Sequence, residues 1–260
     1  SVGKTHNEFK VGQADLWVQA RRLGNPHEAL LFDEIRPEDV MQGHLGDCWL
    51  LSAMASLAEY PEQIQQLFKS QELTKDGCYE IRLFDIAAME WKTVVIDEFI
   101  PCTIQEDGRV QPTFTKPLGD ELWALLLEKA VAKFCGSYAA LSGGGLDWAY
   151  QALTGETNIL AYSKHEGKWR KKHMDLEKQL ERGARNPLNG WYVWKEAESH
   201  HKPEVVFKAI HKHLREKHMV GCIMSGHHHT GEESHHTGLY RRHYYSILQA
   251  CEEHLDDNSH

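Results

Sequence analysis

The segment Gln42-Gly43-His44-Leu45-Gly46-Asp47-Cys48-Trp49-Leu50-Leu51 places a cysteine where a glycine-containing loop gives way to an apolar, helix-forming run. The first turn of a helix carries unpaired N–H groups and partial positive charge, which favour the thiolate form of a cysteine. The side-chain amide of Gln42 can donate to an oxygen that becomes negative during attack on a carbonyl. The segment therefore predicts a nucleophile with its oxyanion donor. The alternative interpretation is that Cys48 is an inert packing residue.

Composition limits the classes of protein that this sequence represents. A chain of 260 residues with 41% hydrophobic content can form one large domain or two lobes around a cleft. The net charge of −9 argues against a nucleic-acid partner. Six cysteines without a CxxC pair indicate a reducing compartment, and we expect neither a signal peptide nor a transmembrane segment. The expected location is therefore intracellular and cytoplasmic.

Hydrophobic periodicity predicts an α+β fold, with helices first and strands later. We expect the five cysteines other than Cys48 to be buried small hydrophobic residues. The expected elements, in chain order, are a short helix and loop over residues 15–31, a helix from Cys48 to Pro61, strands over 79–84 and 91–96, a helix over 121–134, a polar surface region over 164–203, a helix over 205–214, and strands over 219–224 and 243–250.

Two glycine-containing breaks predict a division into lobes. They are Ser142-Gly143-Gly144-Gly145 and Thr154-Gly155. We therefore expect a first lobe over residues 1–154, which contains Cys48, and a second lobe over residues 155–260.

A cysteine nucleophile needs a base, and histidine is the usual one. The chain has 18 histidines, so their number alone does not identify the base. His243 opens the apolar, aromatic run His243-Tyr244-Tyr245-Ser246-Ile247-Leu248. A histidine at the start of a strand is held rigidly, as a general base requires. The alternative interpretation is a half-exposed strand residue without a chemical role.

Three segments resemble the calpains, which are intracellular calcium-dependent cysteine proteases with a papain-like core. They are residues 42–53, the block that runs from Leu122-Trp123 through Leu127-Glu128-Lys129-Ala130 to Tyr138-Ala139-Ala140-Leu141-Ser142-Gly143-Gly144, and His243-Tyr244-Tyr245-Ser246, which is similar to the family's His-Ala-Tyr-Ser motif. The segments follow the family order. The resemblance implies a papain-like α+β fold with a helical first lobe, a strand-rich second lobe and the active-site cleft between them.

The resemblance also implies the catalytic roles. Cys48 matches the nucleophile, His243 the base and Gln42 the oxyanion donor. Gly144 matches a glycine that lies against bound peptide. The implied activity is that of a calcium-dependent endopeptidase, which cleaves intracellular protein substrates through a thioester acyl-enzyme.

A calcium site in the first lobe is a further implication. Asp39 and Glu121 match side chains that bind calcium in the family, and the neighbouring backbone carbonyls fall near Phe32 and Glu34. Calcium takes six to eight hard oxygen ligands, so two carboxylates with carbonyls suit it. The alternative is that Asp39 and Glu121 are ordinary surface acids.

The chain departs from the family pattern in two assessable places. An asparagine within an Asn-Pro-Trp motif follows the histidine in the family, and no such motif occurs before the chain ends at His260. We therefore expect a C-terminally truncated fragment of a protein with further domains. Arg242 stands where the family usually has glycine, so its side chain could crowd the substrate or recruit an acidic residue. These departures keep open a catalytically inactive calpain-like module that binds other proteins.

A histidine-rich stretch precedes His243. Imidazoles at this density can bind transition metals, which would suit a metal-buffering protein. The alternative is an exposed loop insertion without a ligand. The stretch comprises His227-His228-His229 and His235-His236.

Overall fold

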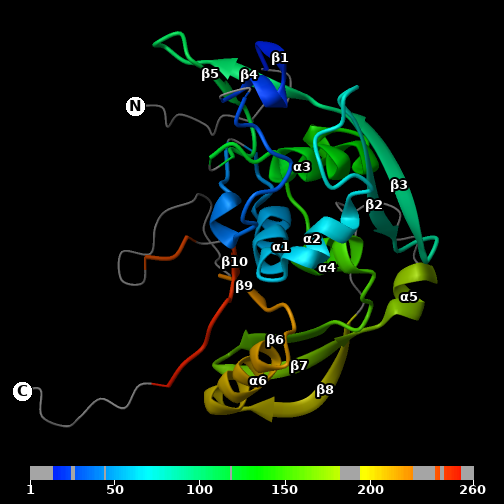
Figure 1. Cartoon of the computed structure of the whole chain (residues 1–260). Coiled ribbons are helices and arrows are strands. Elements are labelled where there is room, and N and C mark those ends of the chain that lie inside the picture. The colour runs from blue at the N-terminus through cyan, green and yellow to red at the C-terminus, as the bar shows by residue number, and fades with distance from the viewer. Residues whose placement is uncertain are drawn as a thin grey trace, which may run out of the picture.

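The computed structural model describes residues 14–24, 27–43, 45–117, 119–181, 194–224, 238–240 and 243–252, and Figure 1 shows how its elements are arranged. The elements, in chain order, are β1 (Leu16–Gln19), η1 (Ala20–Arg22), η2 (Pro37–Asp39), α1 (Cys48–Ala58), α2 (Pro61–Leu67), β2 (Cys78–Asp85), β3 (Glu90–Asp97), β4 (Phe99–Ile104), β5 (Val110–Pro112), α3 (Trp123–Cys135), η3 (Tyr138–Leu141), α4 (Leu146–Thr154), β6 (Leu160–His165), β7 (Lys168–Met174), α5 (Leu176–Glu181), β8 (Trp194–His201), α6 (Pro203–Arg215), β9 (Gly221–Ile223) and β10 (Tyr244–Ser246).

Helix α1 lies at the centre of the described structure. Nine of its 11 residues are buried, so it is apolar nearly all round, as expected of a helix covered on every side. It contacts α2, α4, β9 and β10. The predicted helix is confirmed, and Pro61 occupies the first turn of α2, where its missing N–H has no helical partner to lose.

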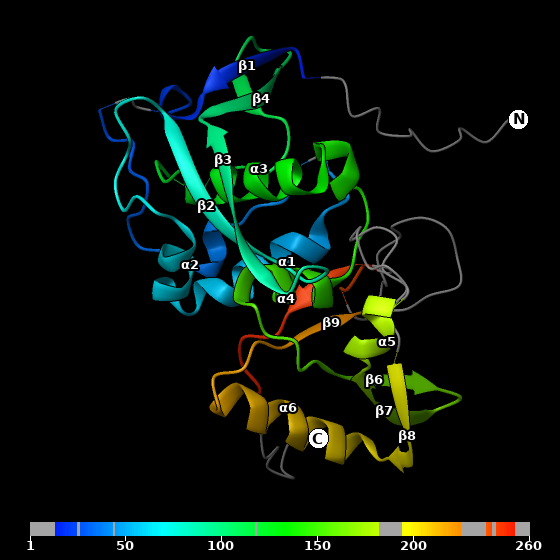
Figure 2. The same ribbon diagram turned by 90° about the vertical axis from the view of Figure 1, so that its right-hand side faces the viewer.

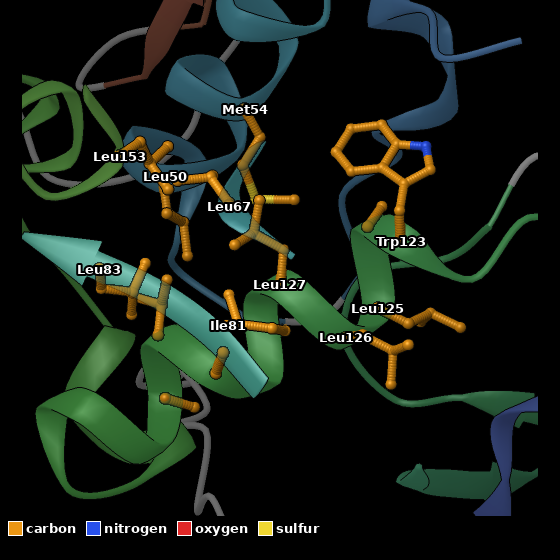
Figure 3. Packing of buried hydrophobic residues seen from close by; sticks show 14 of the residues in the cluster. Leu50, Met54, Leu67, Ile81, Leu83, Trp123, Leu125, Leu126, Leu127 and Leu153 are labelled. Carbon is orange, nitrogen blue, oxygen red and sulfur yellow. The ribbon is translucent and has the colours of Figure 1, made fainter. Parts of the chain in front are cut away.

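The hydrophobic core fills the space between α1, the β2–β3 hairpin and α3. Figure 3 shows Leu50 of α1 near Ile81 and Leu83 of β2 and Leu127 of α3. Each of these four side chains is fully buried. The strands predicted over residues 79–84 and 91–96 are confirmed as the antiparallel hairpin β2–β3, and the predicted helix over 121–134 is confirmed as α3.

The short helix predicted at the start of residues 15–31 is confirmed only as the three-residue η1 (Ala20–Arg22), and the residues before it form a strand instead. Leu16–Gln19 forms strand β1, which pairs antiparallel with β4, with Leu16 opposite Cys102. A run of four residues is too short to show a helical or a strand period. Whether it forms a strand depends on a partner strand that supplies its backbone hydrogen bonds. Here that partner lies about 80 residues further along the chain.

The polar surface region predicted over residues 164–203 lies at the surface in its described part, but it contains regular strands that the sequence did not predict. Strands β6, β7 and β8 form an antiparallel sheet in that order, and β6 lies between α4 and β7 in the chain. The strand β7 carries Lys168, Arg170, Lys171 and Lys172, and its residues are only partly buried or exposed. Strands that bury neither face completely lack the apolar alternation on which a sequence prediction depends.

The expectation that five cysteines are buried hydrophobic residues is only partly correct. Cys102 is buried and Cys135 is partly buried, but Cys78, Cys222 and Cys251 are exposed. Cys78 and Cys222 lie in strands that pair on one side only, so their side chains are not enclosed by the core.

The mixed α+β fold is confirmed, and Figure 2 shows strands on both sides of the central helices. The helix predicted over residues 205–214 is confirmed as α6, and the two C-terminal strands are confirmed as the shorter β9 and β10. The division of the chain at residue 154 stays a prediction. Among the described residues, no helix is both long enough and apolar enough to cross a membrane.

Candidate active site

Cys48 is the first residue of α1. The carbonyl of Asp47 accepts hydrogen bonds from the backbone N–H groups of Leu50 and Leu51, at 2.8 and 3.1 Å, which starts the helix. The Asp47 side chain makes no capping hydrogen bond. The first-turn N–H groups next to Cys48 are therefore not occupied by a capping carboxylate.

Burial raises the pKa of the Cys48 thiol above its ordinary value. A backbone hydrogen bond at Tyr244 acts against this rise, whereas the charge of Asp47 adds to it. The net direction is opposite to the one predicted from the helix terminus alone. Its reason is tertiary, because the strand that carries Tyr244 covers the start of α1 and removes water from the thiol.

The strand β10 (Tyr244–Ser246) packs against α1 and begins directly after His243, so it brings His243 toward Cys48 in space. Ser246 donates from its hydroxyl to the Ser52 carbonyl of α1 at 2.6 Å, and β10 pairs antiparallel with β9. Because the Cys48 thiol contacts the backbone of Tyr244, His243 is one residue from the group that the thiol touches.

The His243 imidazole is half-buried and lies against two aromatic rings. Its centroid is 4.9 Å from that of Tyr245 and 6.1 Å from that of Tyr240. Burial lowers its pKa. Within the described ranges, no hydrogen bond joins this imidazole to the Cys48 thiol. The structure therefore brings together the two segments, with thiol and imidazole both shifted toward their neutral forms.

Gln42 lies on the loop before α1, and its side chain is exposed. Its amide Nε2 donates to the Leu45 carbonyl at 2.8 Å, which closes the loop upon itself. A primary amide has two hydrogens, so one donor remains for an external oxygen. The loop is also held at Gly43, where a Cβ atom would lie 1.7 Å from the Phe114 carbonyl oxygen, so only glycine fits.

The segment after η3 packs against the start of α1. The Trp49 indole donates to the Leu141 carbonyl at 3.0 Å, and the Gly143 N–H donates to the Gly46 carbonyl at 2.8 Å. A Cβ atom at Gly144 would lie 2.4 Å from the Trp49 ring. Close packing on this indole therefore explains the glycine at 144, and its contact with bound peptide stays a prediction.

Asp47 forms a buried pair with Glu128 of α3, which the sequence did not predict. Both residues are 1% exposed, and their side chains interact directly. Apart from this interaction with Glu128, no other residue in the described part of the chain donates a hydrogen bond to the Asp47 oxygens. Glu128 accepts from the Thr115 hydroxyl at 2.7 Å and from the Thr115 N–H at 3.1 Å. Two carboxyls can hydrogen-bond each other only if a proton lies between them.

Burial raises the pKa of both groups, that of Asp47 to about 6 and that of Glu128 well above its ordinary value. Because the two carboxyls are buried together, the pair retains a proton at pH values at which isolated carboxyls are ionised. Burial raises the pKa of the Tyr138 phenol, and the nearby carboxylates of Glu128 and Asp47 add to that rise. An acidic residue on the apolar face of a helix is the one sequence signal of such a pair, and Glu128 lies among the leucines of α3.

A second acidic cluster joins η2 to the start of α3. Asp39 and Glu121 are 6% and 8% exposed, so they are not surface acids. Burial raises the pKa of Glu121 to about 7, and the charges of Asp39 and Asp33 add to the rise. The Trp123 indole lies beside both carboxyls. The Glu121 atom Oε2 has no hydrogen-bond partner among the described residues.

Residues 30–34 run beside this cluster. Leu122 and Trp123 donate from their backbone N–H groups to the carbonyls of Leu30 and Leu31, at 3.0 and 3.2 Å. Phe32, the next residue, is half-buried and packs edge-on against Phe68, whereas Glu34 is exposed and ion-paired with Arg36. Buried carboxylates with an orphaned oxygen, next to irregular backbone, form a donor set that suits a hard cation.

Two sequence-predicted features lie outside the described residues. They are Arg242 and the histidine-rich stretch that comprises His227-His228-His229 and His235-His236.

The whole sequence, residues 1–260, matches the family described as calpain family cysteine protease. The chain belongs to the calpain family of cysteine proteases. It is 42% identical over 133 residues to a calpain-type cysteine protease of Arabidopsis thaliana, a match that covers 51% of this chain and 6% of that protein. It is 38% identical over 134 residues to the calpain-1 catalytic subunit of Mus musculus, over 51% of this chain and 18% of that protein. This calpain-family chain therefore spans a minor part of these relatives.

The buried pair makes a prediction about the Cys48 thiol. Asp47→Asn removes the charge that helps to raise its pKa, so Cys48 should react with iodoacetamide at pH 7 roughly three to ten times faster. Glu128→Gln is the matched control, because it keeps the carboxylate at 47 and an N–H donor to it, and should change this rate less than about twofold. The measurement is alkylation of the Cys48 peptide against pH, followed by mass spectrometry.

The exposed thiols of Cys78 and Cys222 serve as internal references in the same digest. A slower Cys48 reaction in Asp47→Asn, or equal acceleration in both variants, would show that the Asp47 charge does not act on the thiol.

Proposed function

We propose that this chain is the protease region of a calcium-dependent cysteine endopeptidase that cleaves proteins in the cytoplasm. The observation that carries the proposal is the contact between the start of α1 and β10, which puts Cys48 against the residue that follows His243. Membership of the calpain family supports cysteine-protease chemistry at this contact.

In the proposed mechanism, His243 accepts the proton of the Cys48 thiol as the thiol attacks a peptide carbonyl. The free hydrogen of the Gln42 amide and the Cys48 N–H donate to the oxygen that becomes negative. The His243 imidazolium then protonates the leaving amine, which leaves a thioester on Cys48. The neutral imidazole next removes a proton from water, and the resulting attack releases the acid and regenerates the thiol.

The shifts toward neutral thiol and neutral imidazole fit this order of events. Burial disfavours both the thiolate and the imidazolium, so an ion pair is not the resting state favoured at this site. The proton transfer then depends on how closely β10 presents the imidazole to the thiol. A change in the position of β10 relative to α1 would therefore change activity without changing any catalytic residue.

Calcium is the proposed regulator of that position. Asp39 and Glu121 would hold the ion with backbone carbonyls near Phe32 and Glu34, and its charge would neutralise the buried carboxylates. It can favour the aligned arrangement only if it binds that arrangement more tightly than the other. Glu121 begins the connection into α3, which lies beside the β2–β3 hairpin and against the core that surrounds α1.

A catalytically inactive module that binds other proteins is the second candidate. Two observations favour it: no hydrogen bond joins Cys48 to His243 in the described part of the chain, and burial opposes the reactive thiolate. Arg242, where the family usually has glycine, also agrees with this candidate.

Labelling with a thiol-reactive peptide epoxide distinguishes the two candidates. In the full-length protein, we expect covalent labelling of Cys48 that rises at least about tenfold with calcium, because a tenfold rate change needs only 1.4 kcal/mol of better alignment. Cys48→Ala should lose the label and hydrolysis of a protein substrate. Cys222→Ala, which removes an exposed thiol, is the matched control and should retain both.

Absence of labelling and of hydrolysis in the folded wild type would favour the inactive module. Labelling of Cys48 that calcium does not change would support the protease activity but contradict its proposed regulation by calcium.

The calcium site makes a separate prediction about stability. The pKa of Glu121 is about 7 in the folded state, above its ordinary value, so the folded state binds this proton more tightly than the unfolded state. Its contribution to stability is therefore lost as the pH rises from about 4 to 7. Without calcium, Glu121→Gln should raise Tm at pH 7.5 by about 2–4 °C.

Calcium should raise the Tm of the wild type and leave that of Glu121→Gln unchanged. Glu62→Gln, at an exposed position of α2, is the matched control and should behave as the wild type. An equal calcium response in Glu121→Gln and the wild type would place the ion elsewhere.

A further inference from the structure

The C-terminus of α6 ends in a Schellman motif. The His218 N–H donates to the His213 carbonyl at 2.9 Å, and the Lys217 N–H donates to the Leu214 carbonyl at 3.1 Å. Lys217 has φ +61°, the left-handed conformation that this motif requires. The motif fixes the backbone of residues 213–218, so the relative position of the side chains at 213 and 218 is set by hydrogen bonds rather than by chance.

These two positions commonly carry apolar residues that contact each other across the motif. In this chain both are histidines. The His213 and His218 atoms Nδ1 are 3.0 Å apart, and the ring centroids are 5.2 Å apart. The Glu216 carboxylate atom Oε2 lies 3.9 Å from His213 Nδ1 and 3.8 Å from His218 Nδ1. One helix end therefore presents two imidazole nitrogens and a carboxylate oxygen around a common point.

We propose that His213, Glu216 and His218 form a binding site for a divalent transition metal, with zinc as the best match. Zinc bonds to histidine nitrogen and carboxylate oxygen at about 2.0–2.2 Å in tetrahedral geometry, which separates the ligand atoms by about 3.4 Å. The observed separations of 3.0, 3.8 and 3.9 Å lie on either side of that value. Water or a group from a partner would supply the fourth ligand.

The choice of metal follows from the donor atoms. Imidazole nitrogen suits zinc, copper and nickel, whereas calcium prefers oxygen, so this site is chemically distinct from the cluster of Asp39 and Glu121.

The charges around the site act in both directions. The C-terminal end of α6 carries partial negative charge that favours a cation. Lys212, whose ammonium lies 3.7 Å from the other Glu216 oxygen, opposes it, as do Lys171 of β7 and the adjacent Lys217. Moderate affinity and release at acidic pH are therefore expected, because each imidazole that gains a proton loses its free nitrogen.

Metal binding would tie the end of α6 to the segment that enters β9. Only Met219 and Val220 separate His218 from Gly221, and β9 pairs with β10. Metal binding at 213–218 would therefore restrict the connection into β9, whose partner strand β10 begins directly after His243. The site itself does not depend on the proposed protease activity.

Isothermal titration of the full chain with zinc chloride tests the proposal. The wild type should bind one more equivalent of zinc than His218→Ala at pH 7.5, and that difference should disappear at pH 5.5. Glu216→Gln should weaken the same equivalent by roughly tenfold or more, because it removes one ligand. His211→Ala, on the same helix but outside the cluster, is the matched control and should bind as the wild type.

Any zinc bound by the histidines of residues 227–236 is common to all four proteins, so it cancels in the comparison. Equal stoichiometry and affinity in the wild type and His218→Ala would overturn the proposal, and the His213–His218 contact would then be a hydrogen bond only. Circular dichroism of each variant shows whether α6 stays folded. If His218→Ala loses helix, His218→Asn replaces it, and retention of the extra equivalent by that variant would overturn the proposal.

Discussion

The packing of the short strand β10 against the buried helix α1 is the contact on which the candidate site depends. Helix α1 is apolar nearly all round, so it is stable only when other elements cover it. The strand β10 supplies part of that cover, through the hydrogen bond from Ser246 to Ser52 and through Tyr244 at the Cys48 thiol. The interaction that completes the core thus also brings His243 toward Cys48, across about 200 residues of chain.

Burial has a second effect, because it places ionisable groups where charge is disfavoured. The thiol of Cys48, the carboxyl pair of Asp47 and Glu128, and Glu121 all have pKa values shifted toward the neutral form. For the carboxyls, whose unfolded pKa values lie near 4, this shift lowers the stability of the folded chain at neutral pH. Buried acidic residues are typical of functional sites, where they transfer a proton, bind a cation or position a neighbouring side chain.

Much of the fold followed from short-range patterns. The helices around Cys48, over 121–134 and over 205–214 were predicted, because each is long enough to show a helical period. Strand β1 and the sheet β6–β7–β8 were not, because their hydrogen-bond partners are distant in the chain or their faces are polar. In the candidate site, the sequence singled out Cys48, His243 and Gln42, but not the pairing of Asp47 with Glu128, which are 81 residues apart.

The sequence by itself determined the family, the expected roles of Cys48 and His243, and the elements that carry them, because these depend on local motifs and local periodicity. Only the tertiary structure decided the electrostatics. The helix terminus alone favours the thiolate, yet burial under β10 raises the pKa of Cys48. The sequence does not distinguish whether Asp39 and Glu121 are surface acids or metal ligands. In the structure both are buried beside Trp123, so they form a cluster and are not surface acids. Solvent exclusion is a property of the packed chain, and no local pattern encodes it.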